Sequence, residues 1–211
     1  MNSLASRNWP VVLHAPRLLE KGASQVLDVG GNIGNSYYAY ERYLSYPKNL
    51  QWTVHDLPAV HLVGRAQAAE HDHRRQLMFV DDLRQVSSQD ILLANGALQF
   101  LPVSLRQLLS GLSELPPHLI VDRIPIHPSK SFFTLRSIGT AYCPYRVLSE
   151  QDFLGEVTAL GYELVDRWPV PDLACVIPFE PAFSFSGYQG FYFKRQLSFE
   201  PRIAFHVSRP Q

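Results

Sequence analysis

The sequence has little of what defines several common classes of protein. Its 211 residues include two cysteines, Cys143 and Cys175, which are too few for a disulfide framework and which we expect to be reduced thiols. Charged residues make up 18% of the chain and the formal net charge is zero, so the basic excess of a nucleic-acid-binding protein is missing. No apolar run approaches the roughly 18 residues that a membrane-spanning helix requires.

The first residues also lack the charged and apolar blocks of a secretory signal peptide. We therefore expect a cytoplasmic protein that binds a small-molecule substrate, with no nucleic-acid or membrane partner and no metal site; homo-oligomer formation stays open. The length predicts one domain able to bury roughly 70% of its unfolded surface. We expect a short N-terminal extension over residues 1–23, the domain over 24–199 and a C-terminal tail over 200–211.

The segment from Val26 to Gly34 combines a strand pattern with a glycine-rich turn. An apolar run interrupted by Asp28 leads into Gly30-Gly31-Asn32-Ile33-Gly34, and residues 35–43 then contain no proline or glycine. This order predicts a strand, a tight turn and a helix, the first crossover of a parallel α/β sheet. Glycine permits positive φ and the close approach of a ligand, and Asn32 is the next most tolerant residue type.

The rest of the chain alternates strand and helix patterns. Besides residues 25–29, the expected strands are 51–55, 77–80, 90–94, 118–122, 162–168 and 190–194, the last of them antiparallel at or near an edge. Expected helices cover residues 11–21, 59–70 and 105–112, and a further helix begins after Ser149, an N-cap candidate with Asp152 at capping-box spacing. In the helix over 59–70, Val60, Val63 and Gln67 lie at helical spacing. Residues 124–148 are predicted to be an insertion with one extended segment, and residues 169–186 a proline-rich loop.

Polar side chains follow most of these strands at the edge where open α/β sheets bind their ligands. Carboxylates dominate the first three strand ends, which suits a ligand with hydroxyls, an amine and a positive centre better than a polyphosphate. The turn has no Walker lysine, and Asn32 stands where the dinucleotide fingerprint requires glycine. The candidate residues are Asp28, Asp56, Asp81, Asp82, Asn95, Asp122 and Arg123.

Each carboxylate also has a structural interpretation. Asp28 is equally suited to capping the turn, and Asp56 to an ordinary loop before Pro58. The placement of both at successive strand ends favours a shared ligand site.

These residues resemble known families. Residues 26–34 resemble motif I of the class I S-adenosylmethionine-dependent methyltransferases, and residues 52–60 are similar to the second-strand segment of small-molecule O-methyltransferases. A closer resemblance, over roughly residues 26–164, is to a narrower bacterial methyltransferase family with three further motifs. Here these are Leu98-Gln99-Phe100-Leu101, Asp122-Arg123-Ile124-Pro125, and Tyr142-Cys143-Pro144 running to Ser149-Glu150.

The resemblance implies a Rossmann-like, seven-stranded, mostly parallel sheet with helices on both faces, and S-adenosyl-L-methionine as cofactor. It assigns the methionine part of the cofactor to the turn glycines, the ribose to Asp56 with Leu57 beside it, the adenine to Asp81 or Asp82, and the surroundings of the sulfonium to Asn95. The residues implied in cofactor binding are Asp28, Gly30, Gly31, Gly34, Asp56, Leu57, Asp81, Asp82 and Asn95.

Methyl transfer from a sulfonium depends mainly on alignment, and a hydroxyl nucleophile gains from a general base. His127 is the best-placed histidine for that role, although most loop histidines only face solvent. Asp122 and Arg123 either orient the substrate or pair with each other. The aromatic residues Phe132, Phe133, Tyr142 and Tyr145 form either a substrate lid or packing under a long loop.

Three functions compete at this point. The first is a methyltransferase acting on a small polar or sugar-derived metabolite, at an oxygen atom. The second is a catalytically inactive relative that keeps the fold as a binding or assembly protein. The third, a nucleotide-linked oxidoreductase, is disfavoured by the failed fingerprint.

Overall fold

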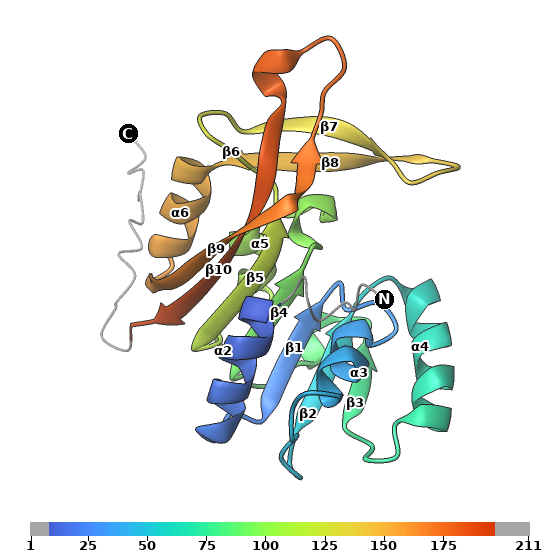
Figure 1. Cartoon of the computed structure of the whole chain (residues 1–211). Helices are drawn as coiled ribbons and strands as arrows, with labels where there is room; N and C mark the ends of the chain where they lie inside the picture. Colours follow the sequence, from blue (N-terminus) through green and yellow to red (C-terminus); the bar gives the residue numbers. More distant parts are fainter. Residues whose placement is uncertain (1–8, 197–211) are drawn as a thin grey trace, which may run out of the picture.

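A seven-stranded sheet forms the centre of the computed structural model, which describes residues 9–196 (Figure 1). Its order is β3-β2-β1-β4-β5-β10-β9. Strands β1 to β5 pair in parallel, and β10 is antiparallel to both of its neighbours. This confirms the mostly parallel sheet and its antiparallel last strand. The strands are β1 (Gln25–Val29), β2 (Gln51–His55), β3 (Leu77–Val80), β4 (Ile91–Asn95), β5 (His118–Ile124), β9 (Tyr162–Cys175) and β10 (Phe185–Arg195).

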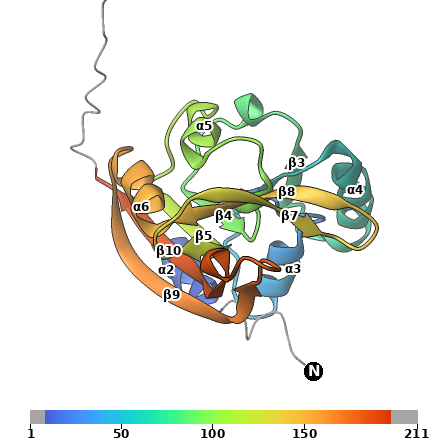
Figure 2. The ribbon, with the colours of Figure 1, turned by 90° about the horizontal axis from the view of Figure 1, so that it is seen from above.

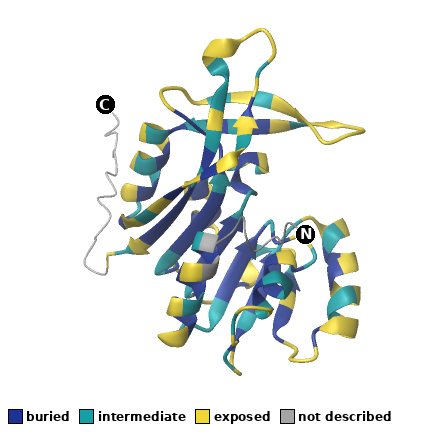
Figure 3. Ribbon diagram, viewed as in Figure 1, coloured by how far each residue is buried: buried dark blue, intermediate teal, exposed yellow. Residues whose placement is uncertain are grey.

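Helices cover both faces of this sheet because its buried strands are apolar on both sides. In β4, Ile91 and Leu93 join the core under α2 and α3, whereas Leu92 and Ala94 join the core under α5 and α6. Buried residues fill the centre of the molecule in Figure 3. Over residues 9–196, none of the helices is both long and apolar enough to cross a membrane. The helices are α2 (Trp9–Glu20), α3 (Asn35–Glu41), α4 (Pro58–His71), α5 (Leu105–Ser110) and α6 (Glu150–Thr158), with 3-10 turns η1 (Leu83–Gln85), η2 (Leu98–Phe100) and η3 (Pro181–Phe183).

The expected extension at the N-terminus contributes to the core, since Val11, Ala15 and Leu18 of α2 are buried. Residues 1–8 and the tail expected over 200–211 lie outside the described residues.

The loop expected over residues 169–186 is wrong in its first part, because β9 continues through Pro169 to Cys175. Proline is tolerated at a sheet edge, where one side of the strand makes no ladder hydrogen bonds. β9 is such an edge: among residues 9–196 its one partner strand in the sheet is β10, and Pro169 lies opposite Gln189.

The insertion contains more regular structure than expected. It forms a second sheet of order β6-β8-β7, made of β6 (Ile126–His127), β7 (Phe132–Ser137) and β8 (Tyr142–Ser149). Pro144 is compatible with this sheet because it is paired on one side of β8, where it lies opposite Leu135 of β7. On the other side of β8, β6 pairs with Leu148 and Ser149. The β7–β8 hairpin crosses above the carboxyl ends of the main strands (Figure 2).

Helix α4 buries a different face from the one that its valines mark. Val63 is 56% exposed, whereas His61 and Gly64 are buried. A Cβ on Gly64 would collide with the ring of Phe79 in β3, so this face is small because the helix lies close to the strand. Apolar spacing alone does not reveal such a face.

Candidate functional site: the turn after β1 and its clefts

The turn between β1 and α3 has the left-handed backbone that its sequence predicts. Gly30, Asn32 and Gly34 have φ values of 70°, 56° and 92°. Asparagine is one of the few residues besides glycine that adopts this conformation readily. The Asn32 side chain also accepts a hydrogen bond from the Ile33 N–H (2.9 Å), which supports the bend locally.

The glycines are needed for packing against the protein itself. A Cβ on Gly30 would overlap Ala97, and one on Gly31 would lie 2.6 Å from the carboxyl carbon of Asp28. The glycine-rich sequence predicts that a ligand approaches the backbone where side chains are absent. In the structure, Ala97 and Asp28 occupy the space next to these two Cα atoms. The turn is therefore held close against Asp28 and against the loop after β4.

Asp28 lies beneath the turn and is fully buried. Its Oδ2 accepts a hydrogen bond from the indole N–H of Trp52 (3.1 Å), and its Oδ1 has no partner among the described residues. Burial raises the pKa of Asp28 to about 7, although the bond from Trp52 acts in the opposite direction.

Asp56 connects the end of β2 to the turn. Its Oδ2 accepts a hydrogen bond from the Asn32 N–H (2.8 Å), and its Oδ1 accepts one from the Leu57 N–H (2.7 Å). An ionised carboxylate has about four acceptor positions, so further donors can be accommodated. Leu57 beside it is 68% exposed, which places an apolar side chain just after the end of β2.

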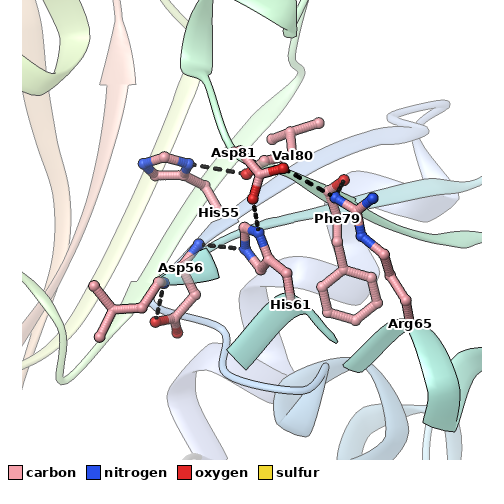
Figure 4. A network of polar contacts seen from close by, with 8 residues as sticks. His55, Asp56, His61, Arg65, Phe79, Val80 and Asp81 are labelled. Carbon is pink, nitrogen blue, oxygen red and sulfur yellow. Dashed lines mark hydrogen bonds and ion pairs between the residues drawn. The ribbon is translucent and has the colours of Figure 1, made fainter. Parts of the chain in front are cut away.

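A buried histidine that the sequence analysis did not single out joins the ends of β2 and β3 (Figure 4). His61 Nε2 accepts a hydrogen bond from the Asp56 N–H (2.8 Å), and its Nδ1 lies 2.6 Å from Asp81 Oδ1. Because a backbone N–H can only donate, we assign the proton to Nδ1, which donates to Asp81. His61 lies one turn into α4, on the face of the helix that is buried. The small residues Gly64 and Ala68 on the same face are the sequence signal that could have indicated this position.

The two carboxylates after β3 have protein partners. Asp81 bonds to His61, which lowers its pKa, and lies 3.3 Å from Arg65. Asp82 caps η1 and pairs with Arg84, and these bonds lower the pKa of Asp82. The adenine contact implied for one of them stays a prediction.

Two adjoining clefts open near the turn. The smaller, about 110 Å³, is lined by residues that include Gly30, Gly31, Asn95 and Arg123. The larger, about 340 Å³, also includes Asn95 and Arg123 in its lining and extends to the hairpin. Asn95 Oδ1 is buried and has no partner among the described residues, so an acceptor is left at the junction of the two clefts. In the part of the chain that the structure describes, there is no cluster of three metal-binding side chains.

Asp122 and Arg123 are neighbours at the end of β5, where Asp122 is buried and Arg123 lines both clefts. Asp122 is fully buried, accepts a hydrogen bond from the indole N–H of Trp168 (2.8 Å), and has its pKa raised by burial. The Nε atom of Arg123 lies 3.9 Å from Asp122 Oδ2, so the two groups are paired. Arg123 has a φ of 57°, a left-handed conformation in a residue type that seldom adopts it.

Both ring nitrogens of His127 have partners in the structure, and its role as a general base stays a prediction. It is buried, its Nδ1 accepts hydrogen bonds from the N–H groups of Ser129 and Lys130, and its Nε2 lies 3.2 Å from the Ala182 carbonyl oxygen. Both ring nitrogens are therefore used in holding the insertion against η3. The sequence places this histidine just after β5 but contains no signal for these loop contacts.

The four aromatic residues of the insertion have different environments. Tyr145 is buried and lines the larger cleft, Phe132 is half-buried, and Phe133 and Tyr142 are exposed. Only part of the set is thus available as a cover for a ligand.

Solved structures of similar shape identify the fold to which this geometry belongs. The chain resembles the glycopeptide N-methyltransferase MtfA complexed with S-adenosyl-L-homocysteine, with a TM-score of 0.62, 11% identity and 90% of each chain covered. The chain has the class I methyltransferase fold. The 1,6-didemethyltoxoflavin-N1-methyltransferase of Burkholderia thailandensis has a TM-score of 0.54 and 20% identity, over 92% of this chain and 79% of that one.

A third structure, the mitomycin 7-O-methyltransferase MmcR, has a TM-score of 0.54 and 14% identity. The match covers 89% of this chain but 54% of MmcR, so the chain spans about half the length of that protein. Neither a protein-family model nor a curated protein sequence matches the chain.

Proposed function

We propose that this protein is an S-adenosyl-L-methionine-dependent methyltransferase that acts on a small polar or sugar-derived metabolite, at an oxygen atom. The observation that carries the proposal is the hydrogen bond from the Asn32 N–H to Asp56. This bond joins the carboxylate after β2 to the glycine turn after β1, in a fold that methyltransferases share. Solved structures of similar shape were determined with S-adenosyl-L-homocysteine bound.

The residues present fit this cofactor. Asn95 lines the cleft beside Gly30 and Gly31, and its buried Oδ1 has no partner in the described chain, which suits an ammonium or hydroxyl donor. The remaining acceptor positions of Asp56 suit the ribose hydroxyls. Exposed Leu57 offers an apolar contact to the adenine.

The bound cofactor supplies a methyl group that its sulfonium makes electrophilic. The chain's own contribution is alignment: rigid strand ends fix Asp56 and Asn95, and His61 fixes the main chain at Asp56. The β7–β8 hairpin crosses above the carboxyl ends of the main strands, a position from which it can limit the access of water to the reacting groups.

Calorimetric titration with S-adenosyl-L-homocysteine tests the proposal. We expect micromolar binding to the wild-type protein, and at least about tenfold weaker binding to Asp56→Asn, because the amide keeps one acceptor but loses the charge. Glu114→Gln, which changes an exposed carboxylate elsewhere, serves as the control and binds as the wild type does. A preference for NAD, or full affinity in Asp56→Asn, contradicts the proposal.

The position of His127 supports a second candidate function, that of an inactive methyltransferase-like binding or assembly protein. Both ring nitrogens of His127 are engaged, and the described lining of the larger cleft contains no histidine. The second function is supported if the protein binds S-adenosyl-L-homocysteine but does not form this product from S-adenosyl-L-methionine with any acceptor in a panel. Product release on one acceptor supports the first.

A further inference from the structure

The larger cleft lies between the ends of the main strands and the insertion. Its lining comes from four parts of the fold: the loop after β4 with η2, the end of β5, the β7–β8 hairpin, and the upper parts of β9 and β10. Its volume of about 340 Å³ exceeds that of a single aromatic ring with two substituents. Aromatic rings form part of its wall, since Phe100 packs edge-on against Tyr145 with ring centroids 5.0 Å apart.

A cation stands at this cleft. The guanidinium carbon of Arg136 lies 5.5 Å from the centroid of the Tyr145 ring, so the aromatic face positions the group. Within residues 9–196, no carboxylate forms an ion pair with Arg136, and the side chain is exposed. A planar guanidinium held in this way is suited to two parallel hydrogen bonds from a carboxylate ligand.

Acceptors without partners stand at the same cleft. Gln99 is 7% exposed, and its Nε2 donates to the Gly96 carbonyl oxygen (3.0 Å), which fixes the orientation of the amide. Its Oε1 is buried and, like Asn95 Oδ1, has no partner among the described residues. Buried carbonyl oxygens are costly unless they accept a hydrogen bond, so this side of the cleft suits a hydroxyl or amine donor.

A carboxylate limits the charge that the cleft accepts. Asp172 of β9 is exposed in the lining and forms no ion pair within the described chain. The negative charge of Asp172 repels a second negative group on a ligand. A ligand with one negative group can place that group at Arg136 and is therefore favoured.

We propose that this cleft binds the methyl acceptor and that the acceptor is a small aromatic monoanion with a hydroxyl group. Its carboxylate pairs with Arg136, its ring lies along the aromatic wall of Phe100 and Tyr145, and its hydroxyl donates to Gln99 Oε1. The inference rests on the proposed function and names the class of substrate for it.

The probe is a panel of single-ring hydroxybenzoates, each paired with its primary amide. Dissociation constants are measured by ligand-observed NMR, with and without S-adenosyl-L-homocysteine. The benzoates are expected to bind at least about tenfold more tightly than their amides. Arg136→Gln abolishes this preference, whereas Arg106→Gln, which removes an exposed cation on α5, preserves it. Asp172→Asn tightens benzoate binding about twofold to fivefold, and Gln99→Leu removes the advantage of the hydroxy compounds over unsubstituted benzoate.

Three results would overturn the inference: equal binding of acids and amides, a preference that survives in Arg136→Gln, or no binding by any member of the panel. S-adenosyl-L-homocysteine binding is measured on the same samples. If this product binds but the acid preference is absent, the inference fails alone. If S-adenosyl-L-homocysteine does not bind, the proposed function fails. The measurements of the benzoate panel in the absence of this product then still test whether the cleft binds an aromatic acid.

Discussion

At the scale of single residues, two buried aspartates have the same arrangement. Asp28 and Asp122 each accept an indole N–H, from Trp52 and Trp168, and each has a second oxygen without a hydrogen-bond partner in the described chain. The second oxygen of Asp122 differs in having the Arg123 Nε atom 3.9 Å away as an ion-pair partner. Burial raises the pKa of both carboxyls. A buried polar atom that is left unsatisfied costs free energy, so such residues are expected where function rather than stability decides the choice.

The raised pKa of Asp28 makes a prediction about stability and pH. Its pKa is about 7 in the fold and 3.8 ordinarily, so between these values the unfolded chain binds fewer protons than the folded one. The stability contributed by this residue therefore falls as pH rises from about 4 to about 7. Asp28→Asn, measured by urea unfolding, should lack this decline and should exceed the wild type at pH 8 by an amount on the order of a few kcal/mol.

Asp172→Asn is the control, because it removes an exposed carboxylate and should leave the pH dependence of unfolding unchanged. If Asp28→Asn and the wild type show the same pH dependence, Asp28 is ionised in the fold and the burial argument fails.

At the scale of elements, the sequence predicts a strand well where a short apolar run is both buried and bounded by turn residues. The expected bounds of β1, β2 and β3 match the structure because short apolar runs there end in turn residues. The edge strand β9 was missed beyond Trp168, since its prolines lose no ladder bond on the unpaired side. The α4 face was misjudged because close packing against Phe79 selects His61 and Gly64.

The candidate site was predictable to a similar extent. Its backbone positions followed from the glycine turn and the strand ends, where topology alone brings distant residues together. The partners of each side chain did not follow. The contacts of His127 with Ser129 and Ala182, and of His61 with Asp81, depend on loop paths that no local pattern specifies.

The turn between β1 and α3 provides a prediction about packing between elements. Gly30→Ala introduces a methyl group that overlaps Ala97 at a φ of 70°, and should destabilise the fold by about 1–3 kcal/mol. Ala97→Gly removes the overlapping methyl. In a double-mutant cycle by urea unfolding, the two changes should therefore couple favourably by about 1 kcal/mol or more. Additive effects would show that the turn does not rest on Ala97.

At the scale of the whole molecule, β10 holds the insertion and the main sheet together. Near its start, Phe185 packs against His127 and Tyr188 accepts a hydrogen bond from Tyr145. Further along, Phe191 and Phe193 pack against Phe153 in the main core. A single strand thus contacts both sheets, and Figure 1 shows β9 and β10 rising from the main sheet to the hairpin.

This continuity predicts that both sheets unfold together. Hydrogen exchange measured across a urea series should give the same midpoint for peptides from β4 and from β8. Tyr188→Phe removes the bond from Tyr145 and should lower both midpoints by the equivalent of about 1 kcal/mol. Tyr43→Phe, at an exposed position, should change neither. Were the β8 midpoint alone to fall, the insertion would be an independent unit and could close over the clefts without disturbing the main sheet.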